Sequence, residues 1–469
     1  MKLTRPTQIE LDKMSHAEKD ALIFSLFDLL EYLEKRLQVV EQQLKKNSSN
    51  SSKPPSSDGL KKAPAQPRKP GEKPVGGQTG HKGTALKMTD KPDMIEWHRP
   101  QGVCSCGIRL DDLPGQETEY RQQIDIPEPK IIITEHRKVV VDCLCGLRHE
   151  GVFPAGIPRH VSYGARLKAY ALGLSHGHFV GLERTTDIIN DQYGVKPSVG
   201  SLQKWTQECA ELLQPDYQKY QQQLIKAATV HFDESGMRVE GKLHWLHIAA
   251  NSDQVIYSCQ TQRGQGGMEA AGILPTFKGI AVHDCWQPYW RYQEATHALC
   301  NAHLLRELNY LEQLLGEAWI TEFKTLLIAA KNAVHLAQQA DKTALEATEV
   351  ADFKHRYQAL CERGLASHPE KPPNVGQKGR HKQHPATNLL KRLKIHQDAV
   401  LRFLENWQVP FDNNRAERAV RCVKVKLKVI GGFRSISGAQ AFCVIRSIWE
   451  TNKLHSQNPF ETLRGVFAG

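Results

Sequence analysis

The feature that most constrains the fold is a run of strand-like segments between residues 227 and 303. Apolar or alternating residues recur in ATVHFDES, MRVEGK, HWLHIAANSD and VIYSCQT, which predicts three or four consecutive antiparallel strands. A helical stretch at about 268–277 follows, and then two more short strands, KGIAVHDC and THALC. This part of the chain therefore predicts one mixed α/β domain.

The order of three strands, a helix and two strands is that of a ribonuclease H-like sheet, in which acids at the ends of the first and fourth strands converge. Asp233 ends the apolar run TVHFD, and Asp284 ends GIAVHD. A third acid is expected from a later helix, DNNRAERAVRCVKVK, in which Asp412 or Asn413 would cap the first turn and Glu417 would follow one turn inside. We expect Asp233, Asp284 and Glu417 to form one site.

Three neighbouring carboxylates repel one another unless cations neutralise them. Oxygen-only ligands select Mg²⁺ or Mn²⁺, and two such ions ~3.5–4 Å apart can activate an attacking oxygen and stabilise a leaving one. Other interpretations stay open, because an aspartate after a strand often forms a turn and Glu417 could pair with Arg421. Glu234, Asp253 and Asp412 are rival acids.

Residues 1–46 predict a coiled-coil helix. Apolar residues recur at alternating spacings of 3 and 4, which is the seam of a coiled coil: Ile23, Leu26, Leu30, Leu33, Leu37, Val40 and Leu44. The helix predicts a homo-oligomer, or alternatively an amphipathic helix that packs on the protein's own core.

Residues 47–91 predict a disordered basic linker. Its start, NSSNSSKPPSSDG, cannot bury apolar surface, and Pro, Gly and basic residues recur after it. The segment could lie along DNA phosphates through counterion release or act only as a tether.

Residues 92–158 predict a small zinc-ribbon-like β module. Two Cys-x-Cys-Gly motifs, at Cys104 and Cys106 and at Cys143 and Cys145, flank a strand-like stretch at 130–142. The usual pair has two intervening residues rather than one, so the four cysteines could instead remain from an ancestral site. His149 is a possible substitute ligand.

Residues 159–226 predict a helical DNA-binding region. GLERTTDIINDQYG, VKPSVG and SLQKWTQECAELL suggest helix, turn and helix, with Ser201 as a cap. Ordinary helical packing is the alternative, and Leu202 and Trp205 are expected in the core. The remaining boundaries follow from the same patterns. We expect the first part of the ribonuclease H-like core at 227–303, an all-helical insertion at 304–405, and the glutamate helix with the C-terminal tail at 406–469.

A basic stripe follows Glu417 on its predicted helix. Arg418, Arg421, Lys424 and Lys428 are spaced 3, 3 and 4 apart, which places them on one face. We expect this face to hold a DNA backbone, with a merely solvated face as the alternative.

Composition limits the classes of function. The chain has 469 residues and a net charge of +11, which favours a polyanionic partner such as nucleic acid. No apolar run is long enough for a membrane span, and the N-terminus lacks the apolar region of a signal peptide. A cytoplasmic protein associated with the bacterial nucleoid is expected, with its eleven cysteines as thiols or metal ligands.

Several stretches resemble transposases of the insertion-sequence sixty-six family. They are HFDESGMRVEGKLHWLH, DNNRAERAVR with the continuation IRSIWETNKLHSQNPFETL, and the layout of zipper-like helix, NSSNSSKPPS, GGQTGHKG and Cys pairs. The resemblance covers nearly the whole chain. The chain departs from the family pattern after Asp284, where Cys285 and Trp286 replace the usual Gly-Tyr.

The resemblance implies a multidomain α+β enzyme whose acidic triad is Asp233, Asp284 and Glu417. HALCNAHLLREL keeps a Cys300-x-x-His303 pair, so His303 is expected beside the site, orienting a substrate phosphate or a carboxylate, or else as a core histidine. The implied function is metal-dependent cleavage of DNA at the terminal repeats of an insertion sequence, followed by strand transfer into target DNA. Small accessory proteins are possible partners. The alternatives are a structure-selective nuclease of the same fold and a non-catalytic DNA-binding protein.

Overall fold

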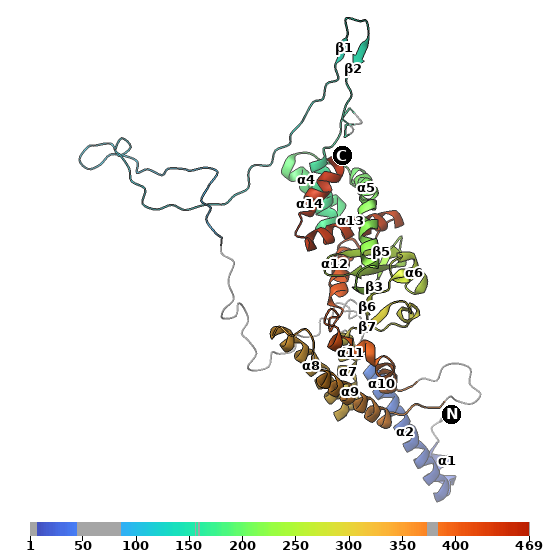
Figure 1. Cartoon of the computed structure of the whole chain (residues 1–469). Helices are drawn as coiled ribbons and strands as arrows, with labels where there is room; N and C mark the ends of the chain where they lie inside the picture. The colour runs from blue at the N-terminus through green and yellow to red at the C-terminus, as the bar shows by residue number, and fades with distance from the viewer. Residues whose placement is uncertain (1–6, 45–85, 155, 158–159, 373–382, 469) are drawn as a thin grey trace. The chain divides into compact units, whose positions relative to one another are not determined.

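The computed structural model of the chain describes residues 7–44, 86–154, 156–157, 160–372 and 383–468 (Figure 1). The chain divides into two compact units, which are described separately. One unit is Lys62–Glu135, and the other combines Met1–Lys61 with His136–Gly469. The strands of the predicted catalytic core all lie in the second unit.

One mixed five-stranded sheet forms the centre of this second unit. Its strands are β3 Thr229–Val239, β4 Lys242–Ala250, β5 Val255–Gln260, β6 Ile280–His283 and β7 Thr296–Leu299. The spatial order is β5-β4-β3-β6-β7. Strands β3, β4 and β5 are antiparallel neighbours, whereas β6 and β7 run parallel to β3.

The strands follow the expected order, with one merger. The segments HFDES and MRVEG, which could have been two strands, form the single strand β3. Glu240 and Gly241 then connect β3 to β4 as a two-residue turn in which both residues have positive φ (53° and 73°), the geometry that best joins antiparallel strands. The sequence-predicted helix at 268–277 is shorter and earlier, with α6 at Gln265–Ala271.

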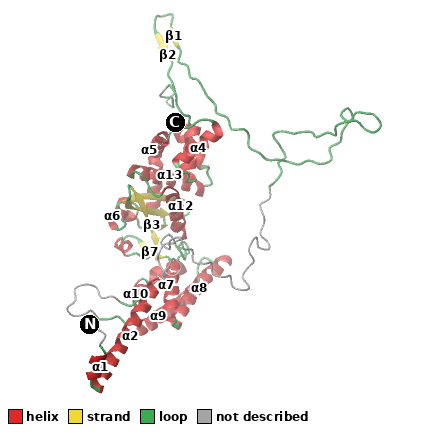
Figure 2. Ribbon diagram, turned by 180° about the vertical axis from the view of Figure 1, so that it is seen from behind, coloured by secondary structure: helices red, strands yellow, loops and turns green. Residues whose placement is uncertain are grey.

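Helices cover both faces of the sheet (Figure 2). On one face, Phe232, Ala249 and Ile256 pack with residues of α6 and of α5, Val199–Ile225. On the other, apolar side chains of β3–β5 pack against α12, Asn414–Ile430, and α13, Ile436–Leu454. The last helix, α14, spans Pro459–Ala468.

Residues between β7 and α12 form a group of helices with its own core. They are α7 Asn301–Leu315, α8 Ala318–Gln339, α9 Ala347–Ser367, α10 Pro385–Ile395 and α11 Gln397–Glu405. The hydroxyl of Tyr357 donates to the Leu393 carbonyl at 2.9 Å, which ties α9 to α10 inside this core. Residues 373–382 of the polar loop lie outside the described part of the chain.

The helical region before the sheet contains α3 Ala165–Leu172, a π-helical turn Gly173–Gly177, α4 Leu182–Tyr193 and α5. The expected helix, turn and helix are present, but Ser201 is not the cap. Helix α5 begins earlier, and the Ser198 hydroxyl accepts from the Ser201 N–H at 3.0 Å. Leu202 and Trp205 are buried, as predicted.

The N-terminal segment forms α1, Gln8–Lys13, and α2, His16–Leu44. Helix α2 contains the heptad seam. The described seam side chains at Ile23, Leu26, Leu30, Leu33 and Leu37 are between 42% and 61% exposed. Residues 45–85 lie outside the described residues. They include the last two residues of the predicted 1–46 segment and most of the predicted linker.

The Cys module contains much less strand than predicted. Of residues 130–142, only Val140–Asp142 forms a strand, β1, which pairs with β2, Arg148–Glu150. Ile132 and Ile133 are almost fully exposed, so no neighbouring surface stabilises an extended ladder there.

The two Cys motifs form matching turns. In each, the first Cys N–H donates to the carbonyl four residues later, and the following glycine has a φ of 88°. The two pairs fall in different units, so zinc binding stays a prediction.

Among the described helices, none is long and apolar enough to cross a membrane.

Candidate active site

Two predicted acids lie at the same level along neighbouring strands. In the parallel pairing of β3 and β6, His231 is the partner of Val282. Asp233 lies two residues further along β3, inside the strand rather than at its end, and Asp284 is the residue directly after β6. Adjacent strands are about 4.8 Å apart, so the two residues start from neighbouring backbone positions. The sheet therefore brings together the two acids that the sequence identified.

Burial and neighbouring acids both affect the ionisation of Asp233. Burial, followed by the negative charges of Glu234, Asp284 and Glu417, raises the pKa of Asp233 well above its ordinary value. The Glu234 N–H donates to Asp233 Oδ1 at 2.8 Å and only partly offsets this effect. Asp233 thus lies within the electrostatic reach of both other members of the expected triad.

Asp284 is oriented by a tight turn after β6. Its Oδ1 accepts from the Trp286 N–H at 2.9 Å. Cys285, between them, has a φ of 71°, a conformation that is uncommon for a residue with a side chain. The Cys-Trp pair that departs from the family pattern therefore forms the turn that holds the carboxylate.

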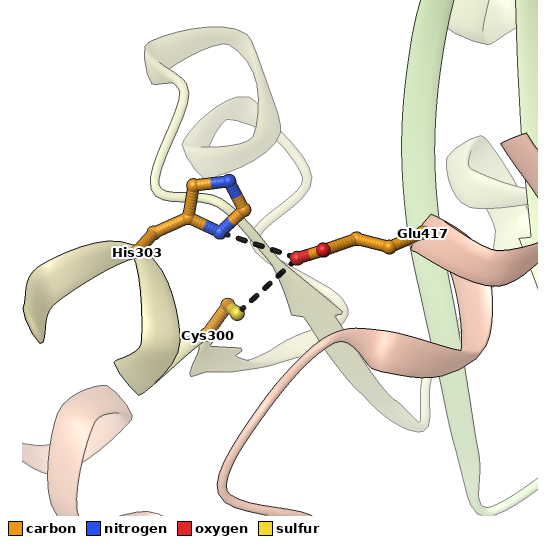
Figure 3. A group of neighbouring side chains, drawn as sticks. All are labelled: Cys300, His303 and Glu417. Atoms are coloured by element: carbon orange, nitrogen blue, oxygen red, sulfur yellow. Dashed lines mark hydrogen bonds and ion pairs between the residues drawn. The ribbon is translucent and has the colours of Figure 1, made fainter. Parts of the chain in front are cut away.

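Glu417 lies in the first turn of α12 and faces α7 (Figure 3). Its Oε1 lies 3.6 Å from His303 Nδ1, 3.9 Å from Cys300 Sγ and 3.5 Å from Arg306 Nη2. Its partners among the described residues do not include Arg421, which was the alternative pairing. The position of Glu417 is therefore set by a helix more than a hundred residues earlier in the chain.

Asn413 connects the start of α12 to the strands. It occupies the N-cap position, but its side chain makes no capping bond. Instead its Nδ2 donates to the Phe232 carbonyl at 2.8 Å, and its Oδ1 lies 2.8 Å from His231 Nδ1. The predicted capping role is thus wrong for Asn413, whereas Asp412 accepts from the Asn414 N–H at 3.1 Å.

The rival acid Glu234 has a different environment. Consecutive strand residues point to opposite faces, so Glu234 points away from the Asp233 side. Arg263 Nη2 donates to its Oε1 and the Tyr289 hydroxyl to its Oε2, each at 2.7 Å. Burial and the charge of Asp284 outweigh these contacts and raise the pKa of Glu234 to about 7. The third rival, Asp253, is exposed.

The basic stripe on α12 is incomplete. Arg418, Arg421 and Lys428 are exposed, and none of them makes an ion pair with another described residue. Lys424 departs from the stripe because its Nζ donates to the Gly236 carbonyl of β3 at 3.0 Å. Its burial lowers the pKa of Lys424.

Within the described residues, one group of side chains has the arrangement of metal ligands: Cys300, His303 and Glu417, with ligand atoms within 4.8 Å of one another. Asp233 and Asp284 are not part of this group. Sequence reasoning missed Arg306, although HALCNAHLLREL contained a signal. Cys300, His303 and Arg306 recur every three residues, which places them on neighbouring positions of one helix.

Comparison with known protein families decides the assignment. Residues 160–441, more than half of the chain, match the model of the transposase IS66 family. The chain therefore belongs to the IS66 transposase family. The match is narrower than the expected resemblance, because it ends before the tail segment IRSIWETNKLHSQNPFETL.

The IS66 match contains the sheet, the helical insertion and Glu417, which assigns this chain to a family of DNA-processing enzymes. Residues 3–87 match a second model, a family of unknown function (DUF6444). No curated protein matches the chain at a significant level.

Proposed function

We propose that this IS66-family protein is a DDE-type transposase with a ribonuclease H-like core, and that Asp233, Asp284 and Glu417 form its triad. The observation that carries the proposal is the convergence of these acids. Asp233 on β3 and Asp284 just after β6 follow neighbouring parallel strands, and the pKa of Asp233 is raised by burial and then by the charges of Glu234, Asp284 and Glu417. Such concentration of negative charge is unfavourable in a merely structural site.

The donor set fits Mg²⁺ or Mn²⁺. Oxygen ligands suit these hard cations, and Asp233, whose pKa is raised by burial and then by neighbouring carboxylates, would be stabilised as an anion by a bound cation. When bound, two such ions would lower the energy of the attacking and leaving oxygens in phosphoryl transfer.

The surrounding side chains would orient the acids and the DNA. The Trp286 N–H fixes the Asp284 carboxylate, and Arg306 and His303 face the Glu417 carboxylate from α7. We assign His303 to orienting Glu417 rather than to proton transfer. The exposed side chains of Arg418, Arg421 and Lys428 would hold phosphates beside the site.

The reaction would proceed in two phosphoryl transfers. Water attacks a phosphodiester at the element end and releases a 3′-hydroxyl, and that hydroxyl then attacks a target phosphodiester. Each step forms one P–O bond and breaks another, so no covalent protein–DNA intermediate is needed.

The remaining modules would bind DNA and pair protomers. The exposed seam of α2 would form a coiled coil with a second copy, which would bring two DNA ends together. The helices α4 and α5, the basic linker and a zinc ribbon at the Cys pairs would supply further DNA contacts.

A strand-transfer assay tests this proposal against the nuclease alternative. A labelled, pre-cleaved element end bearing a free 3′-hydroxyl is incubated with target plasmid, Mg²⁺ and the full-length protein. We expect covalent joining of the end to the plasmid, lost in Asp233→Asn. Degradation of the DNA without joined product would instead identify a nuclease.

A further inference from the structure

The group at Cys300, His303 and Glu417 contains a buried nitrogen with no hydrogen-bond partner. This atom, Nδ1 of His303, faces Glu417 Oε1 at 3.6 Å, which is too long for a hydrogen bond (Figure 3). Leaving a buried polar atom unpaired costs about 1–3 kcal/mol. The arrangement therefore calls for a partner between the two side chains.

The distances fit ligands of one small ion. Zinc binds sulfur at about 2.3 Å and nitrogen or oxygen at about 2.0–2.2 Å, so tetrahedral ligand atoms lie roughly 3.4–3.6 Å apart. The Glu417 oxygen is 3.6 Å from the imidazole nitrogen and 3.9 Å from the Cys300 sulfur. All three ligand atoms lie within 4.8 Å of one another, so modest side-chain movements would bring them to one ion.

The neighbouring backbone already orients the sulfur. Cys300 lies at the N-cap of α7, and its N–H donates to the His283 carbonyl at 2.9 Å. The Asn413 N–H donates to Cys300 Sγ at 3.1 Å, a contact that stabilises negative charge on sulfur. The Cys-x-x-His spacing on one helix then presents both ligands to Glu417.

We propose that Cys300, His303 and Glu417 bind one transition-metal ion of the zinc class, with a fourth position left open. Thiolate and imidazole favour Zn²⁺, whereas Mg²⁺ does not take sulfur ligands. Binding would release the thiol proton of Cys300 to solvent. This site is distinct from the predicted zinc ribbon at the Cys-x-Cys motifs.

The ion would share Glu417 with the proposed triad. A consequence, which rests on the proposed function, is that zinc at this site withdraws Glu417 from the triad and inhibits Mg²⁺-dependent DNA cleavage. The binding of the ion itself does not depend on that function.

Cobalt binding tests the site. In the full-length protein, the four cysteines of the Cys-x-Cys motifs are first replaced by Ser, so that these thiols do not contribute. Co²⁺ then probes the site, because thiolate ligation gives an intense charge-transfer absorption and tetrahedral coordination gives strong d–d bands. We expect one thiolate-bound Co²⁺ per chain, with the charge-transfer band lost in Cys300→Ser and the affinity at this site at least tenfold lower in His303→Gln.

Cys361→Ser is the matched control, because Cys361 is also a buried thiol but belongs to α9. It should keep the band, and circular dichroism should show each variant folded. Absence of a charge-transfer band in the parent, or equal loss in Cys361→Ser, would overturn the proposal.

The same variants test inhibition separately. Micromolar Zn²⁺ added with excess Mg²⁺ should inhibit DNA cleavage by the parent, and Cys300→Ser should be at least tenfold less sensitive. Equal sensitivity would remove the inhibitory consequence. Cobalt binding in a protein that cleaves no DNA would support the metal site while counting against the proposed function.

Discussion

At the scale of single residues, two adjacent acids of β3 have contrasting surroundings. Burial raises the pKa of both Asp233 and Glu234. Only Glu234 has a cation and a hydroxyl on its two oxygens, from Arg263 and Tyr289. The charge of Asp284 acts on both acids, but only Asp233 is affected by Glu417, and only Glu234 is held in an ion pair.

This contrast predicts a pH dependence of stability. Glu234 has a pKa of about 7 when folded against an ordinary value of 4.5, so the folded state binds the proton more tightly. Its contribution to the free energy of unfolding is therefore greatest below pH 4.5 and is lost as pH rises to about 7. Glu234→Gln keeps a neutral acceptor and removes this loss.

As the pH rises from 4.5 to about 7, we expect the free energy of unfolding of Glu234→Gln to increase relative to that of wild type by on the order of 2 kcal/mol. Urea unfolding measured across the same pH range checks this. A constant difference between the two proteins across the range would show that Glu234 does not titrate there.

At the scale of elements, α12 has three different roles along its surface. Its first turn places Glu417 against α7, and Lys424 bonds to β3. Arg418, Arg421 and Lys428 remain exposed. The DNA-facing surface that we propose is therefore made of three cations rather than four.

Salt dependence of DNA binding tests this surface. Arg421→Ala should reduce the magnitude of the slope of log Kobs against log salt by about 0.9, which is the release of one counterion. Lys424→Gln should leave the slope unchanged, because its ammonium group bonds to the β3 backbone.

Lys278→Ala serves as the control, since Lys278 is exposed and paired with Glu294, and neither residue belongs to α12. An Arg421→Ala slope equal to that of wild type would assign α12 a solvated face rather than a DNA contact.

The sequence predicted the strands because their apolar runs and turns are local. It also singled out Asp233 and Asp284 as candidates, because each comes at the end of such a run, and their catalytic role stays a prediction. It could not predict that Arg306 and Cys300 face Glu417, since this contact depends on how the helical insertion packs. Nor does a helical spacing of 3, 3 and 4 reveal that Lys424 faces the sheet. The strand expected at 130–139 is absent because alternation alone supplies no packing partner.

At the scale of the whole molecule, α2 has a row of exposed apolar side chains. Such a row is unfavourable in water unless another surface covers it, and its heptad spacing suits a second copy of the same helix.

Leu30→Glu combined with Leu37→Glu should weaken self-association of the full-length protein at least about tenfold, because both charges fall on the seam. Analytical ultracentrifugation over a concentration series measures this. Ser25→Glu, which lies off the seam, should behave like wild type. An unchanged mass distribution in the double variant would exclude the coiled coil as the oligomer contact.

In the whole assembly, we propose that Asp233, Asp284 and Glu417 act together on DNA. The most direct test is cleavage of a labelled DNA end from the element by the full-length protein in Mg²⁺. Wild type is compared with Asp284→Asn and with Asp253→Asn, which alters an exposed acid outside the triad. We expect cleavage by wild type and Asp253→Asn, none without metal, and a loss of at least a thousandfold in Asp284→Asn with DNA binding retained. Cleavage by Asp284→Asn at the wild-type rate would show that Asp284 is not a catalytic residue.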